Sequence, residues 1–542
     1  MEQEYIVALH RNVDVEQFHL EMIEETGGGV IPAREVSVAN QRTNSKRQFN
    51  YMLTSEEVDW LSKDERVYGI SLKDNPNIVN SVDAIREFNY EKKVNVVNTS
   101  SNWGLVRSNK VANPFNGAGD LAENDNQYDY VLDGSGVDVV IMDTGIQVDH
   151  PEFEDKNGVS RVQQIDWPTA SGLTGLVQSA TFYTDTNGHG THVAATAVGK
   201  TYGWASEAHV YSMKVNLGGD GITDGFDIPD AFDLMLGWHN AKTNGRPTVI
   251  NLSWSTQSVF LPTEWKLEAF VHRNVNYYWN VNFTSRADVY ENLGLLDSTV
   301  IGLPNNYIIM PRRLASYDVS LEELIDAGCL CTVSAGNKPV KHDVPTGIDF
   351  DNRVIMEYIG TTNANFTNGN NYFANYHQGG SPYVDDAMSI GNLDSILNNN
   401  SEEQISQMST RGPAISMLAP GTNIISAWGE GTNYEDTSPD QVVLYPFDSN
   451  FKTVMASGTS MSAPQVAGLA AVYWSLEPTI NNLELKNKLE LDASKDLVYN
   501  TALDNEYDNL RTLLSTPNRI LYNRYSSNTP GSFNSVGNAN FE

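Results

Sequence analysis

The sequence predicts an α/β fold in which a mostly parallel sheet is covered by helices on both faces, preceded by a small α+β unit. Short apolar runs such as Val210–Val215 and Thr248–Leu252 alternate with helical stretches such as Phe226–Ala241, and this alternation is typical of parallel strands joined by helices. Hydrophobic residues make up 40% of the 542 residues, which is enough for a large core. At roughly 150 residues per domain, this length predicts two or more units.

Residues 1–80 are predicted to form the small unit. The strands expected there are Tyr5–Leu9, Phe49–Leu53 and Val67–Leu72. A helix is expected over Val15–Glu25, and Thr54 with Glu57 has the pattern of a capping box that starts a second helix. Residues 81–100 are polar and longer than a minimal junction, so we interpret them as a linker.

The charge of the chain restricts its partners. The formal net charge is −33 and the sequence pI is near 4.5, which argues against nucleic acid or an anionic membrane as a partner. No apolar run approaches the roughly 18–20 residues of a membrane span. The first residues, Met1–Leu9, lack the basic and apolar regions of a secretory signal. The expected location is therefore intracellular or in a virus particle, or else outside the cell after removal of a signal. Cys329 and Cys331 are expected to be buried and reduced.

A candidate nucleophile lies in the segment Gly458–Pro464 (Gly-Thr-Ser-Met-Ser-Ala-Pro), which is followed by the alanine-rich run Gln465–Val472. This run predicts the start of a buried helix. Ser460 at its mouth would lie near the positive end of the helix dipole, which suits a reaction that develops negative charge. A serine in this position can also be a simple helix cap, so the assignment requires partners elsewhere.

Three further segments supply such partners. Val139–Gly145 is an apolar run that ends on Asp143 and Gly145, the pattern of a buried strand that delivers a carboxylate. Asn187–Ala194 places His189 between two glycines before another helical run. Cys331–Asn337 predicts a strand that is followed by the amide side chain of Asn337.

Asp143, His189, Asn337 and Ser460, in this chain order, resemble the motifs of the subtilisin-like serine proteases (subtilases, peptidase S8), with proteinase K-like features. The resemblance implies that Ser460 is the nucleophile, that His189 is its base and that Asp143 orients the imidazole. It also implies that the Asn337 amide and the backbone N–H of Ser460 bind the oxyanion. The two histidines and the acid near these positions, His192, His150 and Asp149, are expected to have packing or structural roles.

The resemblance assigns substrate binding to three short segments. These are Gly221, Ile222 and Thr223; Ser253, Trp254 and Ser255; and Ser334, Ala335 and Gly336. The first would be an edge strand that pairs with the substrate backbone, and the other two would be the walls of the pocket for the residue before the cleaved bond. The bulky Trp254 either narrows this pocket or packs outside it, and the sequence leaves both alternatives open.

The catalytic domain is predicted over residues 101–525, with insertions at about 256–315 and 338–380 and a flexible tail at 526–542. The first insertion is aromatic, which favours packed cover over a binding surface. The segment Val198–Gly203 lacks the loop that builds the family's strong calcium site. A weaker structural calcium site among the carboxylates stays open, with no ligand set legible.

The resemblance implies a serine endopeptidase that acts on proteins or peptides, needs no cofactor for its chemistry and is made as a zymogen. Residues 1–80 would be an inhibitory pro-domain that assists folding and is cut off by the enzyme itself. The alternative is a subtilase fold that serves as a structural or binding component, for example of a virus particle, with the pro-domain retained.

Overall fold

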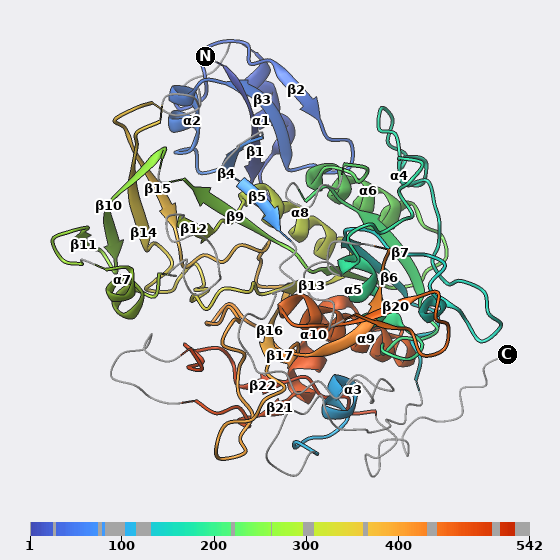
Figure 1. The fold of residues 1–542 in the computed structure, drawn as a ribbon. Coiled ribbons are helices and arrows are strands. Elements are labelled where there is room, and N and C mark those ends of the chain that lie inside the picture. Colours follow the sequence, from blue (N-terminus) through green and yellow to red (C-terminus); the bar gives the residue numbers. More distant parts are fainter. Residues whose placement is uncertain are drawn as a thin grey trace.

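The structure is a computed structural model of the 542-residue chain. It describes residues 2–24, 29–73, 78–81, 103–114, 132–217, 223–261, 263–283, 285–295, 308–360, 367–430, 442–500 and 510–525. Its centre is an eight-stranded sheet of order β21-β22-β17-β16-β13-β8-β6-β7, parallel except for the β21–β22 pair (Figure 1). The strands are β6 (Asp138–Asp143), β7 (His209–Lys214), β8 (Thr248–Leu252), β13 (Leu330–Ser334), β16 (Met388–Leu393), β17 (Met417–Pro420), β21 (Ser494–Lys495) and β22 (Arg519–Ile520).

Helices cover both faces of this sheet, as the sequence predicts. Val139 and Ile141 of β6 belong to a core shared with helices α5 (His189–Val198) and α9 (Thr459–Leu476). The alternate residues of the same strand, Val140 and Met142, belong to a second core shared with α6 (Ile228–Ala241) and α8 (Ala315–Asp326). Because successive side chains of a strand point to opposite faces, an apolar run without polar alternation is buried on both.

Smaller elements complete this part of the molecule. They are α3 (Trp103–Ser108), the 3₁₀ turn η2 (Pro151–Phe153), α4 (Trp167–Ser171), α10 (Asn482–Asp492) and a sheet of β18 (Ile424–Trp428), β20 (Lys452–Ala456) and β19 (Val442–Leu444). All residues of α5 and the first sixteen of α9 are buried, because their small side chains allow close packing of the two helices. Among the described residues, no helix is both long and apolar enough to cross a bilayer.

The N-terminal unit is a four-stranded antiparallel sheet with two helices and its own apolar core. Its elements are β1 (Gln3–Leu9), α1 (Val15–Ile23), β2 (Val38–Gln41), β3 (Gln48–Leu53), α2 (Ser55–Leu61) and β4 (Val67–Leu72), and the sheet order is β2-β3-β1-β4. The predicted capping box of Thr54 and Glu57 is present, whereas β2 was not predicted. Strands β1 and β4 of this unit contact helix α8, one of the helices that cover the large sheet (Figure 1).

A short strand follows the N-terminal unit in the chain. β5 (Ile78–Ser81) pairs antiparallel with β9 (Ser255–Phe260), which pairs on its other side with β12 (Ile308–Pro311). Ser81 lies opposite Ser255 and Ile78 opposite Ser258. The predicted linker therefore begins within or just after a strand, and most of its residues lie outside the described part of the chain.

The two predicted insertions fold together into one sheet, an outcome that the sequence did not indicate. Its order is β11-β10-β14-β15, with β10 (Trp265–His272) and β11 (Val275–Tyr278) from the first insertion and β14 (Arg353–Tyr358) and β15 (Asn371–Asn375) from the second. Figure 1 shows these strands side by side at the left, with α7 (Arg286–Leu293) below them.

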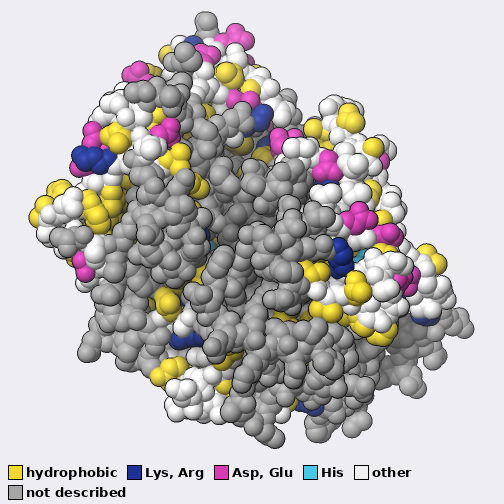
Figure 2. Space-filling view, viewed as in Figure 1, with side chains coloured by type: hydrophobic (Ala, Val, Ile, Leu, Met, Phe, Trp, Pro, Cys, Tyr) yellow, Lys and Arg dark blue, Asp and Glu magenta, His cyan; other side chains and the backbone are white. Residues whose placement is uncertain are grey.

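The aromatic residues of this insertion sheet pack mainly on one another. Trp265 is buried and stacks edge-on or tilted against Phe260, Tyr358 and Tyr372, within a core that belongs to the insertions. Tyr278 is 54% exposed. Figure 2 shows hydrophobic side chains at the left edge of the molecule, over β10 and β11. The expected aromatic cover is thus a separate layer with its own core rather than a coating on the large sheet.

Candidate active site

The candidate catalytic residues come from the carboxyl ends of adjacent strands and from two helix starts. Asp143 is the last residue of β6, Ser253 follows β8 directly, and Asn337 lies three residues after β13. Because β6, β8 and β13 are parallel neighbours, these ends meet at one edge of the sheet. Ligands of such sheets bind at this edge.

Asp143 and His189 form a buried, close pair. His189 Nδ1 lies 2.7 Å from Asp143 Oδ1, and both side chains are essentially inaccessible to solvent. The same carboxylate oxygen accepts the backbone N–H of Thr144 at 2.8 Å. A carboxylate at Nδ1 favours the tautomer that carries its hydrogen on Nδ1, and this tautomer leaves Nε2 basic.

A second carboxylate, which the sequence reasoning missed, fixes this pair in place. Buried Asp185 accepts the hydroxyl of Thr144 at 3.0 Å, the N–H of Gly188 at 2.8 Å and the N–H of Thr191 at 2.8 Å. Burial raises the pKa of its carboxyl. Asp185 thereby ties the end of β6 to the start of α5. The available signal was an aspartate four residues before His189, close to where a helix cap is expected.

Ser460 is the second residue of α9 and is held against the loop after β8. Pro464 has no N–H to donate to the Ser460 carbonyl, and this carbonyl instead accepts the Ser253 hydroxyl at 3.1 Å. The Ser460 hydroxyl donates to the backbone carbonyl of Ser253 at 3.0 Å. The nucleophile candidate therefore lies at the positive end of an eighteen-residue helix, at the same sheet edge as Asp143.

Asn337 is oriented by the residue that precedes Ser460. Its Oδ1 accepts the N–H of Thr459 at 2.7 Å and the Thr459 hydroxyl at 2.9 Å. Because both bonds use the oxygen end of the amide, the NH₂ end is directed away from Thr459. Gly336, with a φ of +107°, also donates its N–H to the Thr459 hydroxyl at 3.1 Å. These contacts join the loop after β13 to the start of α9.

The competing histidines are built into packing. His192 Nε2 lies 3.0 Å from the carbonyl of Ile424 and 3.1 Å from that of Val454, and burial lowers its pKa to about 3. His150 lies 3.2 Å from the carbonyl of Lys452, and burial lowers its pKa to about 4. Histidines with such low pKa values stay neutral near pH 7 and exchange protons poorly there.

Two of the predicted substrate segments are described. Ser253, Trp254 and Ser255 run from the end of β8 into β9, and Ser334, Ala335 and Gly336 run out of β13. Ser381, which the sequence did not indicate, bridges them, because its hydroxyl lies 2.5 Å from the Ser334 carbonyl and 3.3 Å from that of Trp254. In the remaining segment, which was predicted to be an edge strand, Gly221 and Ile222 lie outside the described residues. Thr223 is exposed and is not part of a strand.

Trp254 packs into the core on the α6 and α8 side of the sheet. It is 1% exposed and lies edge-on to Phe232 of α6 and Tyr317 of α8. Of the two alternatives that the sequence left open, the structure matches packing outside the pocket.

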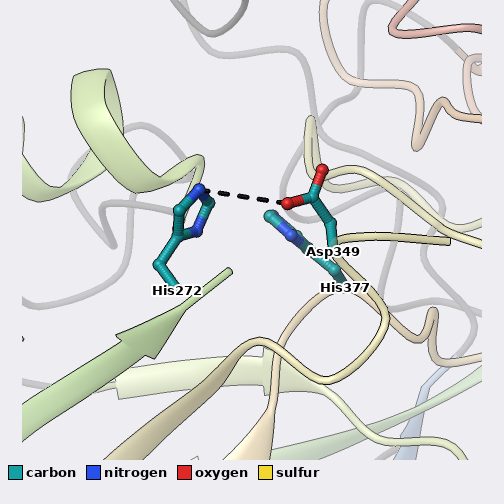
Figure 3. A group of neighbouring side chains, drawn as sticks. All are labelled: His272, Asp349 and His377. Carbon is teal, nitrogen blue, oxygen red and sulfur yellow. Dashed lines mark ion pairs between the residues drawn. The ribbon is translucent and has the colours of Figure 1, made fainter. Parts of the chain in front are cut away.

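One group among the described residues has the composition of a metal site. His272, Asp349 and His377 are buried, with potential ligand atoms within 4.8 Å of one another (Figure 3). However, Arg273 donates to both oxygens of Asp349 at 2.7 and 2.9 Å, and the Lys341 ammonium lies 2.7 Å from Oδ2. A carboxylate already paired with two cations does not fit a divalent ion, and imidazoles are poor calcium ligands. We interpret this group as an ion-pair network.

Sequence comparison relates the chain to known proteins. The subtilase family profile matches residues 134–513. A cuticle-degrading serine protease of Arthrobotrys oligospora is 25% identical over 432 residues, covering 79% of this chain and 69% of that protein. The subtilase-type proteinase psp3 of Schizosaccharomyces pombe is 24% identical, covering 72% of this chain and 56% of that protein. Part of each relative thus lies outside the match.

A solved structure with a similar fold is a cold-adapted subtilisin-like serine proteinase. It is 22% identical, with a TM-score of 0.42, and the match covers 78% of this chain and 98% of that one. The family assignment rests on the profile, which spans more than half of the chain and contains Asp143, His189, Asn337 and Ser460. The chain therefore belongs to the subtilase family of serine endopeptidases.

Proposed function

We propose that this protein hydrolyses peptide bonds through an acyl-enzyme on Ser460. The Ser460 oxygen attacks the carbonyl carbon of the substrate while His189 Nε2 takes the hydroxyl proton. His189 then gives this proton to the leaving amine as the C–N bond breaks. Water, deprotonated by the same imidazole, hydrolyses the ester and restores Ser460. In the subtilase family, this reaction is carried out by side chains and backbone groups and needs no cofactor.

The observation that carries this proposal is the 2.7 Å contact between Asp143 and His189. Asp143 holds the imidazole with Nε2 as the basic nitrogen and stabilises the imidazolium that forms. The amide of Asn337, oriented by Thr459, and the N–H of Ser460 would bind the oxyanion, and such a donor contributes about 3–4 kcal/mol to the transition state.

We further propose that the chain is a zymogen that cuts itself. Support comes from the register of β5 on β9, in which Ser81 lies opposite Ser255. Two residues before Ser255 is Ser253, whose carbonyl accepts the Ser460 hydroxyl. Because antiparallel partners advance in opposite directions along the chain, β5 at Ser81 is directed toward the end of β9 that follows Ser253. We expect the cleaved bond within about five residues after Ser81.

N-terminal sequencing of the purified protein tests self-cleavage. The parent should yield a new N-terminus within the segment 82–101, with the first cut soon after Ser81. Ser460→Ala should stay full length when produced under the same conditions. Identical processing in both proteins would assign the cut to another protease. The structural-component alternative predicts no cut in either protein, and the similarity to named serine proteases does not favour it.

A further inference from the structure

Two helices begin at the candidate active site, and the charges at their N-terminal ends are the subject of this inference. α5 begins with His189, and α9 begins with Thr459, one residue before Ser460. Each follows a glycine that provides no side-chain cap, and neither has an acidic residue in its first turn. The N-terminal end of a helix carries a partial positive charge. This charge favours an oxyanion that develops beside Ser460, but it opposes the imidazolium that His189 must become.

Asp185 supplies the negative charge that the first turn of α5 lacks. One of its oxygens accepts the N–H of Gly188 at 2.8 Å and that of Asn187 at 3.2 Å. The other oxygen accepts the N–H of Thr191 at 2.8 Å and the hydroxyl of the same residue at 2.6 Å. Asp185 is 1% exposed. Its carboxylate is therefore a buried cap on the N-terminal end of α5, supplied from three residues before the glycine at the usual capping position.

The partners of Asp185 indicate that it is ionised. Three of them are backbone N–H groups, which can only donate. The Thr144 hydroxyl accepts the N–H of Gly190 at 2.8 Å, which leaves its hydrogen for Asp185 at 3.0 Å. The Thr191 hydroxyl likewise accepts the N–H of Gln147 at 2.9 Å. Burial raises the pKa of Asp185, but a protonated carboxyl would leave its own hydrogen unpaired among these donors.

The elements packed against α5 bring few other charges to this helix end. β6 contributes Asp143, the carboxylate that His189 contacts. α9 and β18 contain no charged residue. His192 of α5 itself stays neutral near pH 7, because burial lowers its pKa to about 3. Glu152 of η2 accepts the N–H of Thr201, beyond the opposite end of α5.

One buried cation contacts the residue that precedes Asp185. The Lys214 ammonium lies 3.1 Å from the carbonyl of Thr184. It lies 2.8 Å from the Asp224 carboxylate, with which it forms an ion pair. Within the described part of the chain, Asp185 itself forms no ion pair with a lysine or arginine, so its charge acts on the helix end and on the groups beside it.

We propose that Asp185 is a positioning residue whose charge neutralises the positive end of α5 and thereby allows His189 to become a cation there. This inference rests on the proposed catalysis through Ser460. Asp185 acts through the N–H groups of the helix end and through Thr144, the neighbour of Asp143 in the chain. The end of α9 has no such carboxylate cap and keeps its positive charge for the oxyanion. The two helix ends thus stabilise opposite charges in one transition state.

Asp185→Asn removes the charge with little change in shape. The acid limb of the pH profile of kcat/KM for a short peptide reports the pKa of His189 in the free enzyme. In this variant the acid limb should move to lower pH by about one unit, and kcat at pH 8 should fall roughly tenfold. An added protease removes the N-terminal unit from every protein compared, so that differences in self-cleavage do not enter. A loss of activity with the acid limb unmoved would indicate a purely structural role and overturn the proposal.

Thr144→Val is the matched control for the loss of a hydrogen bond without the loss of charge. It removes the hydroxyl that links Asp185 to the end of β6. The variant should lower kcat, while its acid limb should move by less than about 0.3 of a pH unit, because the carboxylate stays in place. An acid limb that moves as far as in Asp185→Asn would assign the effect to geometry rather than to charge and overturn the proposal.

Asn187→Asp tests the same charge effect by addition. The Asn187 Oδ1 accepts the N–H of His189 at 3.2 Å, and an aspartate keeps this acceptor while it adds a negative charge at the same helix end. The acid limb should move to higher pH by about 0.3–0.7 of a unit. In the Asp185→Asn background, the same substitution should restore part of the lost shift. An unmoved acid limb in Asn187→Asp alone would overturn the proposal, and this result does not require Asp185→Asn to fold.

NMR of isotopically labelled histidine tests the charge effect without catalysis. In Ser460→Ala, the ring signals of His189 are assigned by their absence when His189→Ala is added. The titration midpoint of His189 should fall by about one pH unit when Asp185→Asn is added, and should rise with Asn187→Asp. Midpoints that stay the same in both variants would overturn the proposal. If the midpoints move but the parent hydrolyses no peptide, the proposal is supported and only the proposed function is contradicted.

Discussion

Asp143 and Asp349 are both buried carboxylates beside histidines, yet their surroundings differ in charge. Asp143 bonds His189 at 2.7 Å and the Thr144 N–H, and no described donor reaches its second oxygen. Asp349 lies 3.9 Å from His272 (Figure 3). It is also paired with Arg273 and Lys341. The charge of Asp349 is thus neutralised by ion pairs with two cations, whereas Asp143 interacts with one imidazole.

The pKa values follow from this difference. Burial pushes the pKa of Asp349 upward, but hydrogen bonds from Arg273 and Lys341 outweigh burial and hold the pKa well below its usual range. Burial lowers the pKa of the neighbouring His377 to about 3, so that histidine stays neutral. Residue types alone do not distinguish a catalytic pair from a structural one. The charge balance around the carboxylate does.

The largest expected effect comes from removing the histidine that pairs with Asp143. His189→Ala should lower kcat for a short peptide by roughly 10⁴- to 10⁶-fold, the scale known for subtilisin, because nucleophile and base act as a unit. Because His189→Ala should not cut itself, an added protease removes the N-terminal unit from both proteins, and the thermal melts of the two cut proteins provide the control for folding. A variant that keeps more than about a tenth of the parent's kcat would contradict the assigned role of His189.

Asn337→Ala should have the next largest effect. It should lower kcat by roughly 10²–10³ with little change in KM, because the oxyanion donor acts mainly in the transition state. Thr459→Val is the matched comparison, since it removes one of the two donors that orient Asn337 and should cost less. A large rise in KM with kcat preserved would contradict the oxyanion role.

Breaking the Asp349 network should change stability and leave the chemistry unchanged. Asp349→Asn removes the negative charge that Lys341 and Arg273 share and should destabilise the protein by about 3–5 kcal/mol, toward the lower value because Arg273 is 37% exposed and Lys341 also lies 3.5 Å from Asp343. kcat for a short peptide should stay the same below the melting transition. Zinc should not raise the melting temperature of the parent. A zinc-dependent rise in the melting temperature would contradict this interpretation and indicate a metal site.

The smallest effect, near neutral pH, is a pH dependence from neutral buried histidines. Burial lowers the pKa of His192, His342 and His377 to about 3. Because the unfolded pKa is near 6.5, these groups stabilise the fold above about pH 6.5 and lose that contribution as pH falls toward 3. As pH falls from 7.5 to 6.5, each histidine should lower the free energy of unfolding by a few tenths of a kcal/mol, and by more per pH unit below pH 6.5. Melting temperatures of Ser460→Ala across this range measure it, and a constant value down to pH 4 would contradict the expectation.

Local signals in the sequence predicted the elements whose environment is set by neighbours in the chain. The apolar run before Asp143, the alanine-rich run after Ser460 and the Thr54 capping box correspond to β6, α9 and α2. The roles of the side chains at the sheet edge stay predictions until they are tested.

Long-range pairing was not predictable in the same way. The pairing of β10 with β14 joins segments about eighty residues apart in the sequence. The alternation of polar and apolar residues within a strand does not specify which strand it pairs with. The same holds for β5 on β9 and for the cations that surround Asp349. Trp254 illustrates the limit at one residue, because only the positions of Phe232 and Tyr317 decide which way its ring packs.

The most direct test of the account is labelling by a fluorophosphonate, which reacts only with a serine activated by a base. The processed parent should be labelled on Ser460, as located by peptide mass analysis, and Asp349→Asn should be labelled at a comparable rate. His189→Ala, after removal of its N-terminal unit by an added protease, should not be labelled. Absence of labelling in the parent after the N-terminal unit has been removed would contradict the central claim that Asp143 and His189 activate Ser460.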